Sequence, residues 1–220
     1  MNFLEMCQEL VLEAGYSGEI LTVDDQRGQF ARVVRWIRNA ATVLQTEHPD
    51  WTFMTREFSF DTTAGKQKYS PADLAALGVE NVDRWLREGF RVSKGDGPSG
   101  PLRHVHMQLF ARRYANPRES RPVNWTESID RGLVFGNIPD DVYTITGKYQ
   151  MSPVTLLADE DVPPVPEAFH QAIVWKGLAY YGTNEEAPGA VERGESEYAK
   201  AMGKMRLLYL PDVRMFGRRT

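Results

Sequence analysis

A Gly-Lys pair is the first feature of this sequence that could do chemistry. The stretch "TTAGKQKY" places Lys66 directly after Gly65, and such a pair after a strand occurs in loops that bind nucleotide phosphates. A phosphate loop also needs an earlier glycine, a Ser or Thr after the lysine, and a helix that follows it. Here Gln67 follows the lysine, and the residues beyond it have a strand pattern. We therefore predict a β-hairpin with Gly65 in its turn.

Histidines and carboxylates are the next candidates, because both can bind a metal ion. His104 and His106 alternate on an expected strand, which places them on one face. A zinc site usually needs three or four ligands, and His48 and His170 are distant in the sequence. The acidic run Asp159–Asp161 lies in a proline-rich stretch without the glycine of a calcium loop. We expect histidines at surface or cap positions, a solvated acidic linker, and no metal or cofactor.

The candidate nucleophiles lack the partners that would activate them. Cys7 lies on the apolar stripe of an expected helix, which indicates a small core residue. Ser93, Ser99 and Ser152 lack the G-x-S-x-G elbow of serine hydrolases. No residue qualifies as catalytic, and we predict that the protein is not an enzyme. A metal-dependent hydrolase that uses the two neighbouring histidines and the acidic linker stays open as an alternative.

The composition is that of a folded chain with an acidic balance. Its 220 residues are 42% hydrophobic, enough for one large domain or two small ones. The net charge of -4 argues against a general nucleic-acid binder. A single cysteine fits folding in a reducing cytoplasm, and no apolar run is long enough to cross a membrane. We therefore expect synthesis in the cytoplasm and no membrane partner.

The expected elements begin with two helices. Asn2 and Glu5 have the spacing of a capping box, and Gly15 ends the first helix. Thr22 is the expected cap of a long second helix, whose apolar residues recur at helical spacing as far as Leu44. The second helix is expected to end at "HPDW", because proline cannot continue a helix.

Between Trp51 and Met151 the pattern changes to that of β-strands. A strand with alternating aromatic residues leads into the predicted hairpin, and one short helix is expected at about 105–114. Further strands are expected at Asn81–Leu86, Phe90–Ser93, Val123–Ser128, Gly132–Gly136 and Val142–Gln150.

Two more helices close the chain after the acidic linker, one starting near Pro166 and one at about 187–210. The predicted fold class is therefore α+β, with an α-helical bundle from the N- and C-terminal helices and an inserted antiparallel β domain. The predicted domains are a helical bundle formed by residues 1–50 and 163–220, an inserted β-rich domain at 51–162, and a C-terminal tail at 211–220.

Two groups of side chains are candidates for contacts with other protein chains. Arg32 and Trp36 lie on or beside a second stripe of the long helix, and both residue types are enriched at interface anchors. Trp36 could instead pack beneath the β layer. The stretch Ala111–Arg121 holds four arginines and Tyr114, which could meet phosphate, form a solvated face or rim a partner site. The last two readings are favoured, and the inter-subunit candidates are Arg32, Trp36, Arg112 and Arg113.

The C-terminal tail combines apolar and basic side chains. This mixture is unusual for a terminus, because chain ends are usually polar and loose. Such a segment often becomes ordered against a partner, and simple fraying is the alternative. The candidates for a partner contact are Arg214, Met215, Phe216, Arg218 and Arg219.

The order and spacing of several stretches resemble tailed-phage head–tail adaptors, which are also called portal adaptors or head-completion proteins. The stretch "GQFARVVRWIRNAATVLQTEHPDWTFM" resembles the long second helix of that family, with its closing motif carried by Asp50, Trp51 and Phe53. The stretch "FSFDTTAGKQKYSP" resembles the family's hairpin, with Gly65 and Tyr69 in place. The stretches "FLEMCQELVLEAG" and "GLVFGNIPDDVYTITGKYQ" resemble its opening and closing parts, so the resemblance covers nearly the whole chain.

The resemblance implies a structural virion protein at the head–tail junction. Copies would form a homo-oligomeric ring, expected to be a dodecamer, that joins the DNA-filled head to the tail and extends the DNA channel. The implied partners are other copies of the chain, the portal protein, a tail or nozzle protein, and genomic DNA that passes through the lumen without specific binding. Adaptor tails commonly reach into the portal, which makes the tail residues named above the portal-binding candidates. Another neck or tail-completion protein is the alternative within this class.

Overall fold

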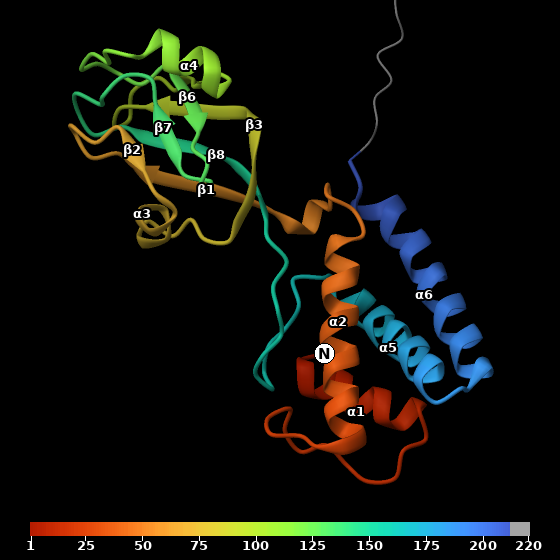
Figure 1. Cartoon of the computed structure of the whole chain (residues 1–220). Coiled ribbons are helices and arrows are strands. Elements are labelled where there is room, and N and C mark those ends of the chain that lie inside the picture. The colour runs from red at the N-terminus through yellow and green to blue at the C-terminus, as the bar shows by residue number, and fades with distance from the viewer. Residues whose placement is uncertain (212–220) are drawn as a thin grey trace, which may run out of the picture. The chain divides into compact units, whose positions relative to one another are not determined.

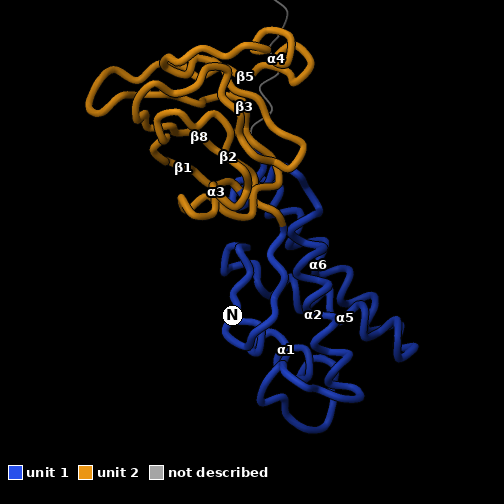
Figure 2. Tube along the Cα trace, turned by 60° about the vertical axis from the view of Figure 1, so that its left-hand side comes forward, with its two compact units in different colours: residues 1–54, 153–220 blue, residues 55–152 orange. Residues whose placement is uncertain are grey.

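The computed structural model describes residues 1–211, and the chain divides into two units. The first, here called the helical unit, comprises Met1–Met54 and the chain from Pro153 onward. The second, here called the β unit, comprises Thr55–Ser152 (Figure 2). Helices from both ends of the chain thus enclose a β-rich insertion in the sequence, and the predicted α+β fold class is confirmed.

The helical unit begins with the capping box that the sequence predicts. The side-chain oxygen of Asn2 accepts the N–H of Glu5, and the Glu5 carboxylate accepts the N–H of Asn2, each at 2.8 Å. Both bonds satisfy amides that the first helical turn leaves without a partner. The helices of this unit are α1 (Phe3–Glu13), α2 (Gly28–Thr46), the 3-10 turns η1 (Thr52–Met54) and η2 (Glu167–Phe169), α5 (His170–Asn184) and α6 (Pro188–Tyr209).

Helix α2 begins later than its sequence pattern predicts. Its N-cap is Arg27, which makes no side-chain capping bond, and Gly28 follows with φ of +60°. The predicted cap at Thr22 is wrong, because the Thr22 hydroxyl accepts the N–H of Asp24 within the preceding loop. The segment Gly15–Arg27 is therefore a long loop between α1 and α2 (Figure 1).

Helix α5 packs against α1, α2 and α6, as Figure 1 shows. Two glycines bring the backbones of α5 and α6 into contact. A Cβ atom on Gly194 would lie 2.6 Å from the Trp175 carbonyl oxygen and 2.7 Å from the Ala179 nitrogen. A Cβ atom on Gly182 would lie 2.7 Å from the Val191 nitrogen. Only glycine fits at these two crossings, because every other side chain would overlap with backbone atoms.

The acidic stretch before α5 is exposed at Glu160, as expected of a solvated linker, but it is also bonded to the rest of the helical unit. The Phe3 N–H donates to the Asp161 carbonyl at 2.8 Å, and the Asp159 carboxylate accepts the Val23 N–H at 2.6 Å. Farther along, the buried Gln45 side chain bonds both the N–H and the carbonyl of Val154. The proline-rich stretch forms no helix or strand, so its backbone N–H and C=O groups need other hydrogen-bond partners, and these contacts provide some of them.

The β unit consists of two four-stranded sheets and two short helices. The first sheet has the order β1 (Thr55–Asp61), β8 (Thr144–Met151), β3 (Val82–Ser93) and β4 (Gly100–Pro101). The second has the order β2 (Lys68–Tyr69), β7 (Leu133–Phe135), β6 (Asn124–Glu127) and β5 (Arg103–His104). The helices are α3 (Pro71–Ala76) and α4 (Met107–Arg113). The strand pairs are antiparallel except β5 with β6, and a parallel pair needs a crossover such as α4.

The predicted hairpin around Gly65 is wrong. Strand β1 pairs with β8 in the first sheet, whereas β2 pairs with β7 in the second. The residues between β1 and β2 therefore carry the chain from one sheet to the other. The Gly65 N–H donates to the Pro139 carbonyl at 2.8 Å, and the Tyr69 hydroxyl accepts the Thr63 N–H at 2.7 Å. The alternating pattern predicted both strands correctly, but alternation does not specify the partner of a strand.

Aromatic rings from both sheets share one core. Phe90 of the first sheet stacks on Trp125 of the second, with ring centroids 4.1 Å apart. Phe60 and Tyr69, at the two ends of the sheet crossing, have centroids 5.4 Å apart. Aromatic pairs contribute about 0.5–1.5 kcal/mol each beyond the burial of their surface. No strand of one sheet pairs with a strand of the other. Packing of the aromatic rings therefore holds the two sheets together.

The contact between α5 and α6 predicts a large effect of one added methyl group. We expect Gly194→Ala to destabilise the helical unit by about 1–3 kcal/mol, because the methyl group meets backbone atoms that cannot move independently. Gly203→Ala is the matched control, since nothing lies within 4 Å of a Cβ there. The control should gain about 0.5–1 kcal/mol of helix propensity. Urea unfolding measures both, and equal effects of the two substitutions would contradict the close contact.

Candidate interaction surfaces

Arg32 and Trp36, two inter-subunit candidates, both face the end of α5. The Arg32 guanidinium forms an ion pair with Glu185 at 2.9 Å, and both side chains are partly exposed. The Trp36 ring is only 6% exposed and meets the edge of the Tyr181 ring at a centroid distance of 6.2 Å. Within one copy, Trp36 is thus a packing residue between α2 and α5. A role for either residue between copies stays a prediction.

Two of the four histidines, His104 and His106, line one hollow of the β unit, whereas His48 and His170 belong to the helical unit. His104 lies on β5 with its ring edge-on to Trp125, and His106 is the N-cap of α4, where its ring accepts the Gln108 N–H. His170 is buried and bonds the Val165 carbonyl at 2.8 Å. His48 packs edge-on to a neighbouring tryptophan. No group of three metal-ligating side chains occurs within residues 1–211.

The lone cysteine lies in the core of the helical unit. Cys7 has no exposed surface, and burial raises the pKa of its thiol to about 12. The nearby Arg38 guanidinium opposes this shift, but burial dominates. The thiolate, which is the reactive form, is therefore strongly disfavoured at neutral pH. The prediction that Cys7 is a core residue is confirmed.

The Gly-Lys pair has a structural contact of its own. The Lys66 ammonium forms an ion pair with Asp73 at 2.7 Å and lies 5.0 Å from the centre of the Tyr69 ring. Asp73 also forms the capping box of α3 with Ser70, and the Lys66 bond, followed by those to Ser70, holds the pKa of its carboxyl well below its usual range. A strand, not a helix, follows the lysine, as the sequence predicts. Lys66 thus fixes the start of α3.

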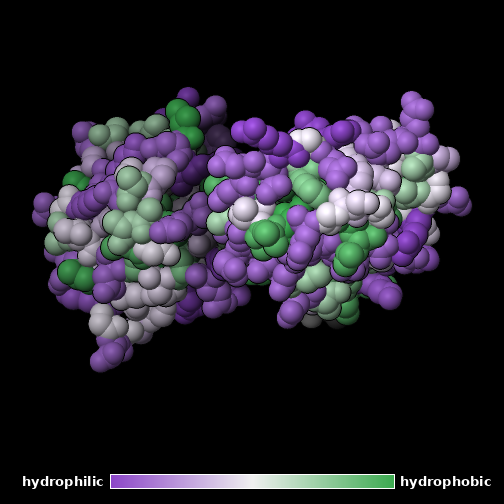
Figure 3. Space-filling model, turned by 90° about the horizontal axis from the view of Figure 1, so that it is seen from below, coloured by the Kyte–Doolittle hydropathy of each residue, from purple (hydrophilic) through white to green (hydrophobic). Residues whose placement is uncertain are grey.

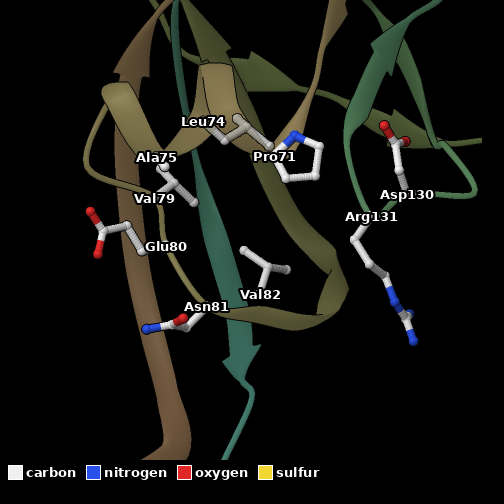
Figure 4. Close-up of a pocket in the computed structure, with 9 residues that line it drawn as sticks. All are labelled: Pro71, Leu74, Ala75, Val79, Glu80, Asn81, Val82, Asp130 and Arg131. Carbon is white, nitrogen blue, oxygen red and sulfur yellow. The ribbon is translucent and has the colours of Figure 1, made fainter. Parts of the chain in front are cut away.

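One hollow of the β unit lies beside α3, with a volume of about 470 Å³. Figure 4 shows an apolar wall from Pro71 to Val82 on one side and Asp130 with Arg131 on the other. The Asp130 carboxylate is already bonded by the Ser128 hydroxyl, and this bond lowers the pKa of Asp130. The second carboxylate of the hollow, Glu80, lies across from Asp130 in Figure 4, so the two do not form an acid–base pair.

A second hollow, of about 450 Å³, collects arginines from three parts of the β unit and is here called the arginine hollow. Arg103 comes from β5, Arg113 from the end of α4, and Arg121 from the chain before β6. Arg113 was an inter-subunit candidate from its sequence, and Arg112 precedes it on α4 and is exposed. Sequence reasoning missed Arg103, because its position beside the others depends on the pairing of β5 with β6.

The tail candidates Arg214, Met215, Phe216, Arg218 and Arg219 lie outside the described residues. Their role at a portal therefore stays a prediction from the sequence.

Comparison with protein families decides the identity of the chain. The sequence matches the SU10 adaptor protein family over residues 1–219. The chain belongs to the SU10 adaptor protein family. This match confirms the resemblance to phage head–tail adaptors, and it supports a structural role in the virion for this adaptor. No curated protein matches the chain.

None of the helices in residues 1–211 is long and apolar enough to span a bilayer.

The surroundings of His104 predict a pH dependence of stability. Burial lowers its pKa from the ordinary value of 6.5, and the positive Arg87 and His106 act in the same direction, while Glu127 opposes them. The unfolded chain, with an ordinary pKa, therefore binds more protons than the folded chain as the pH falls through this range. His104 thus lowers stability as the pH falls below about 6.5.

Thermal unfolding of the adaptor and of its His104→Gln variant over this pH range tests the assignment. We expect the melting temperature of the variant to fall less steeply with decreasing pH, whatever its value at neutral pH. Parallel curves for the two proteins would show that His104 contributes nothing to the pH dependence.

Proposed function

We propose that copies of this adaptor assemble into a ring beneath the portal and join the DNA-filled head to the tail. The match to an adaptor family over residues 1–219 is the observation that carries this proposal. The expected ring is a dodecamer of identical contacts, each between two different faces of the chain, which is how a heterologous interface closes. The protein acts through interfaces and carries out no catalysis.

The division of the chain supports separate roles for its two parts. We assign the ring body to the helical unit and a tail-facing or outward layer to the β unit. The helical bundle suits a ring body, because the contact of α5 with α6 through Gly182 and Gly194 fixes its helices closely. The β-rich domain presents loops and short strands, which are common binding elements on a rigid scaffold.

The charge of the chain fits a channel that lets DNA pass. The described part of the helical unit carries 17 acidic and nine basic side chains, a net charge of -8. Acidic walls repel the phosphate backbone and so avoid tight binding of the moving genome. In this proposal the genomic DNA is a passing partner, whereas the portal protein and a tail or nozzle protein are bound ones.

Deletion of residues 212–220 tests the portal contact. We expect the truncated chain to lose binding to portal rings while its melting temperature stays unchanged, because the residues assigned to that contact are removed and the two units are not. Sedimentation of mixtures with purified portal, followed by negative-stain microscopy, measures the binding. Portal binding equal to that of the full chain would remove the tail from the proposal.

Two substitution variants separate the chemistry of that contact. Met215→Ser with Phe216→Ser removes the apolar pair, and Arg218→Gln with Arg219→Gln removes the final charges. An apolar anchor predicts that the first pair weakens binding at all salt concentrations, while charge contacts predict an effect of the second pair that fades at high salt. Particles that remain monomeric beside the portal and copurify with stoichiometric metal would favour the hydrolase alternative.

A further inference from the structure

The arginine hollow combines a charged rim with an apolar wall. Arg103, Arg113 and Arg121 line it together with Val92 and Val123. The Val123 side chain is 46% exposed, which is unusual for a large apolar residue with charged neighbours. Arginine forms planar pairs of hydrogen bonds with carboxylates, so this hollow suits a segment that carries both acidic and apolar side chains.

The rim arginines are partly held in place by the β unit. The Arg121 guanidinium donates to the Val92 carbonyl at 2.8 Å, and Arg113 lies 5.8 Å from the centre of the Tyr114 ring. The Tyr114 hydroxyl in turn donates to the Asn124 side-chain oxygen at 2.6 Å. A binding site whose side chains are already positioned loses less conformational entropy when a partner arrives.

The charge of the hollow is not neutralised within the β unit. Residues 100–121 contain five arginines and one acidic residue, Glu119. None of these five arginines has a carboxylate partner among residues 1–211. The lysines of the same unit are all paired, in the ion pairs Lys66–Asp73, Lys68–Asp130, Lys94–Asp141 and Lys148–Glu57. Three of the five arginines, Arg103, Arg113 and Arg121, line the hollow, which therefore carries positive charge without a carboxylate partner.

The loop Gly15–Arg27 of the helical unit has the complementary chemistry. Leu21 is 74% exposed and lies between Glu19 on one side and Asp24 and Asp25 on the other. Within the described part of the chain, these three carboxylates accept no hydrogen bond and form no ion pair. In Figure 1 the loop lies between α1 and α2, and Figure 3 shows hydrophobic atoms among hydrophilic ones on that face of the helical unit.

Other exposed apolar side chains of the helical unit fit the hollow less well. Leu157 is 63% exposed, but the neighbouring Asp159 and Asp161 carboxylates are occupied by the bonds to Val23, Leu157 and Ala158. Leu207 is 86% exposed, but its neighbours Lys204 and Arg206 are positive, as the hollow is. Leu12 is as exposed as Leu21, but the neighbouring Glu13 carboxylate is already paired with Arg193. The loop at Leu21 therefore offers three acidic side chains without such a partner, which favours it as the occupant of the hollow.

We propose that the loop Gly15–Arg27 of one copy docks into the arginine hollow of the next copy. Leu21 packs against the exposed Val123, and the loop carboxylates pair with Arg103 and Arg113. The proposal rests on the ring of the proposed function and names the two faces that meet in it. Since the faces differ, each copy uses its loop toward one neighbour and its hollow toward the other, which is the geometry of a closed ring.

Cross-linking between differently labelled copies tests this contact directly. Leu21→Cys and Val123→Cys are made separately in the full chain, and Cys7 stays silent because it is buried. A short bismaleimide added to assembled mixtures of the two variants should give a covalent dimer, whereas each variant alone should give none. Only a contact between copies can join the two, since neither variant carries both thiols.

Charge reversal provides a second, independent measurement. We expect Arg103→Glu with Arg113→Glu to reduce assembly at least about tenfold, because the loop carboxylates then meet like charges. Asp24→Arg with Asp25→Arg should have a similar effect, and a chain carrying all four changes should recover assembly. Arg112→Glu with Arg118→Glu is the matched control, because it reverses two exposed arginines that do not line the hollow.

Each other outcome counts against the docking contact. Rings that form without a mixed cross-link would overturn it while leaving the proposed function intact. An equal loss for Arg112→Glu with Arg118→Glu would indicate a general charge effect. Reversed arginines that abolish DNA binding but not assembly would assign the hollow to nucleic acid. If no ring forms under any condition, with or without portal, the proposed ring fails and this contact with it.

Discussion

The backbone contact between α5 and α6 is the constraint on which the helical unit depends. Gly182 and Gly194 let the two helices meet without side chains between them, so the position of α6 relative to α5 has little freedom. Helix α5 also contacts α1 and α2, and therefore transmits this fixed position to the N-terminal part of the chain. The acidic stretch before α5 then binds along the same helices through its backbone groups.

The β unit is held together differently, because no hydrogen-bond ladder joins its two sheets. Stacked and edge-on aromatic rings fill the space between them, and the chain crosses from one sheet to the other next to the Phe60–Tyr69 pair. The parallel pairing of β5 with β6 places Arg103 beside residues that follow α4. The arginine hollow thus exists because of the same crossover that closes the second sheet.

Features set by neighbouring residues were predictable from the sequence. The Asn2–Glu5 capping box and the end of the first helix depend on local spacing, and both are present. Most expected helices and strands are present too, but α3 and β4 were not predicted, and two expected strands form the single strand β3. Features set by distant residues were not predictable. The partner of β1, the bound state of the acidic stretch and the place of Arg103 each depend on contacts across more than 20 positions of the chain. The number of arginines in and after α4 marked this stretch in the sequence, but the hollow that they line with Arg103 could not be predicted.

The chain enters the β unit through β1 and leaves it through β8, and these two strands pair with each other. Thr55, the first residue of the β unit, lies opposite Gln150 near its end, with the Thr55 hydroxyl bonded to the Gln150 side chain at 3.0 Å. Because the two ends of the insertion are adjacent, the residues of the helical unit on either side of it do not have to move apart to accommodate it. The helical unit can therefore keep its geometry when the β unit is lengthened, shortened or replaced. Sequence changes in the β unit can accumulate in evolution without disturbing the helical unit.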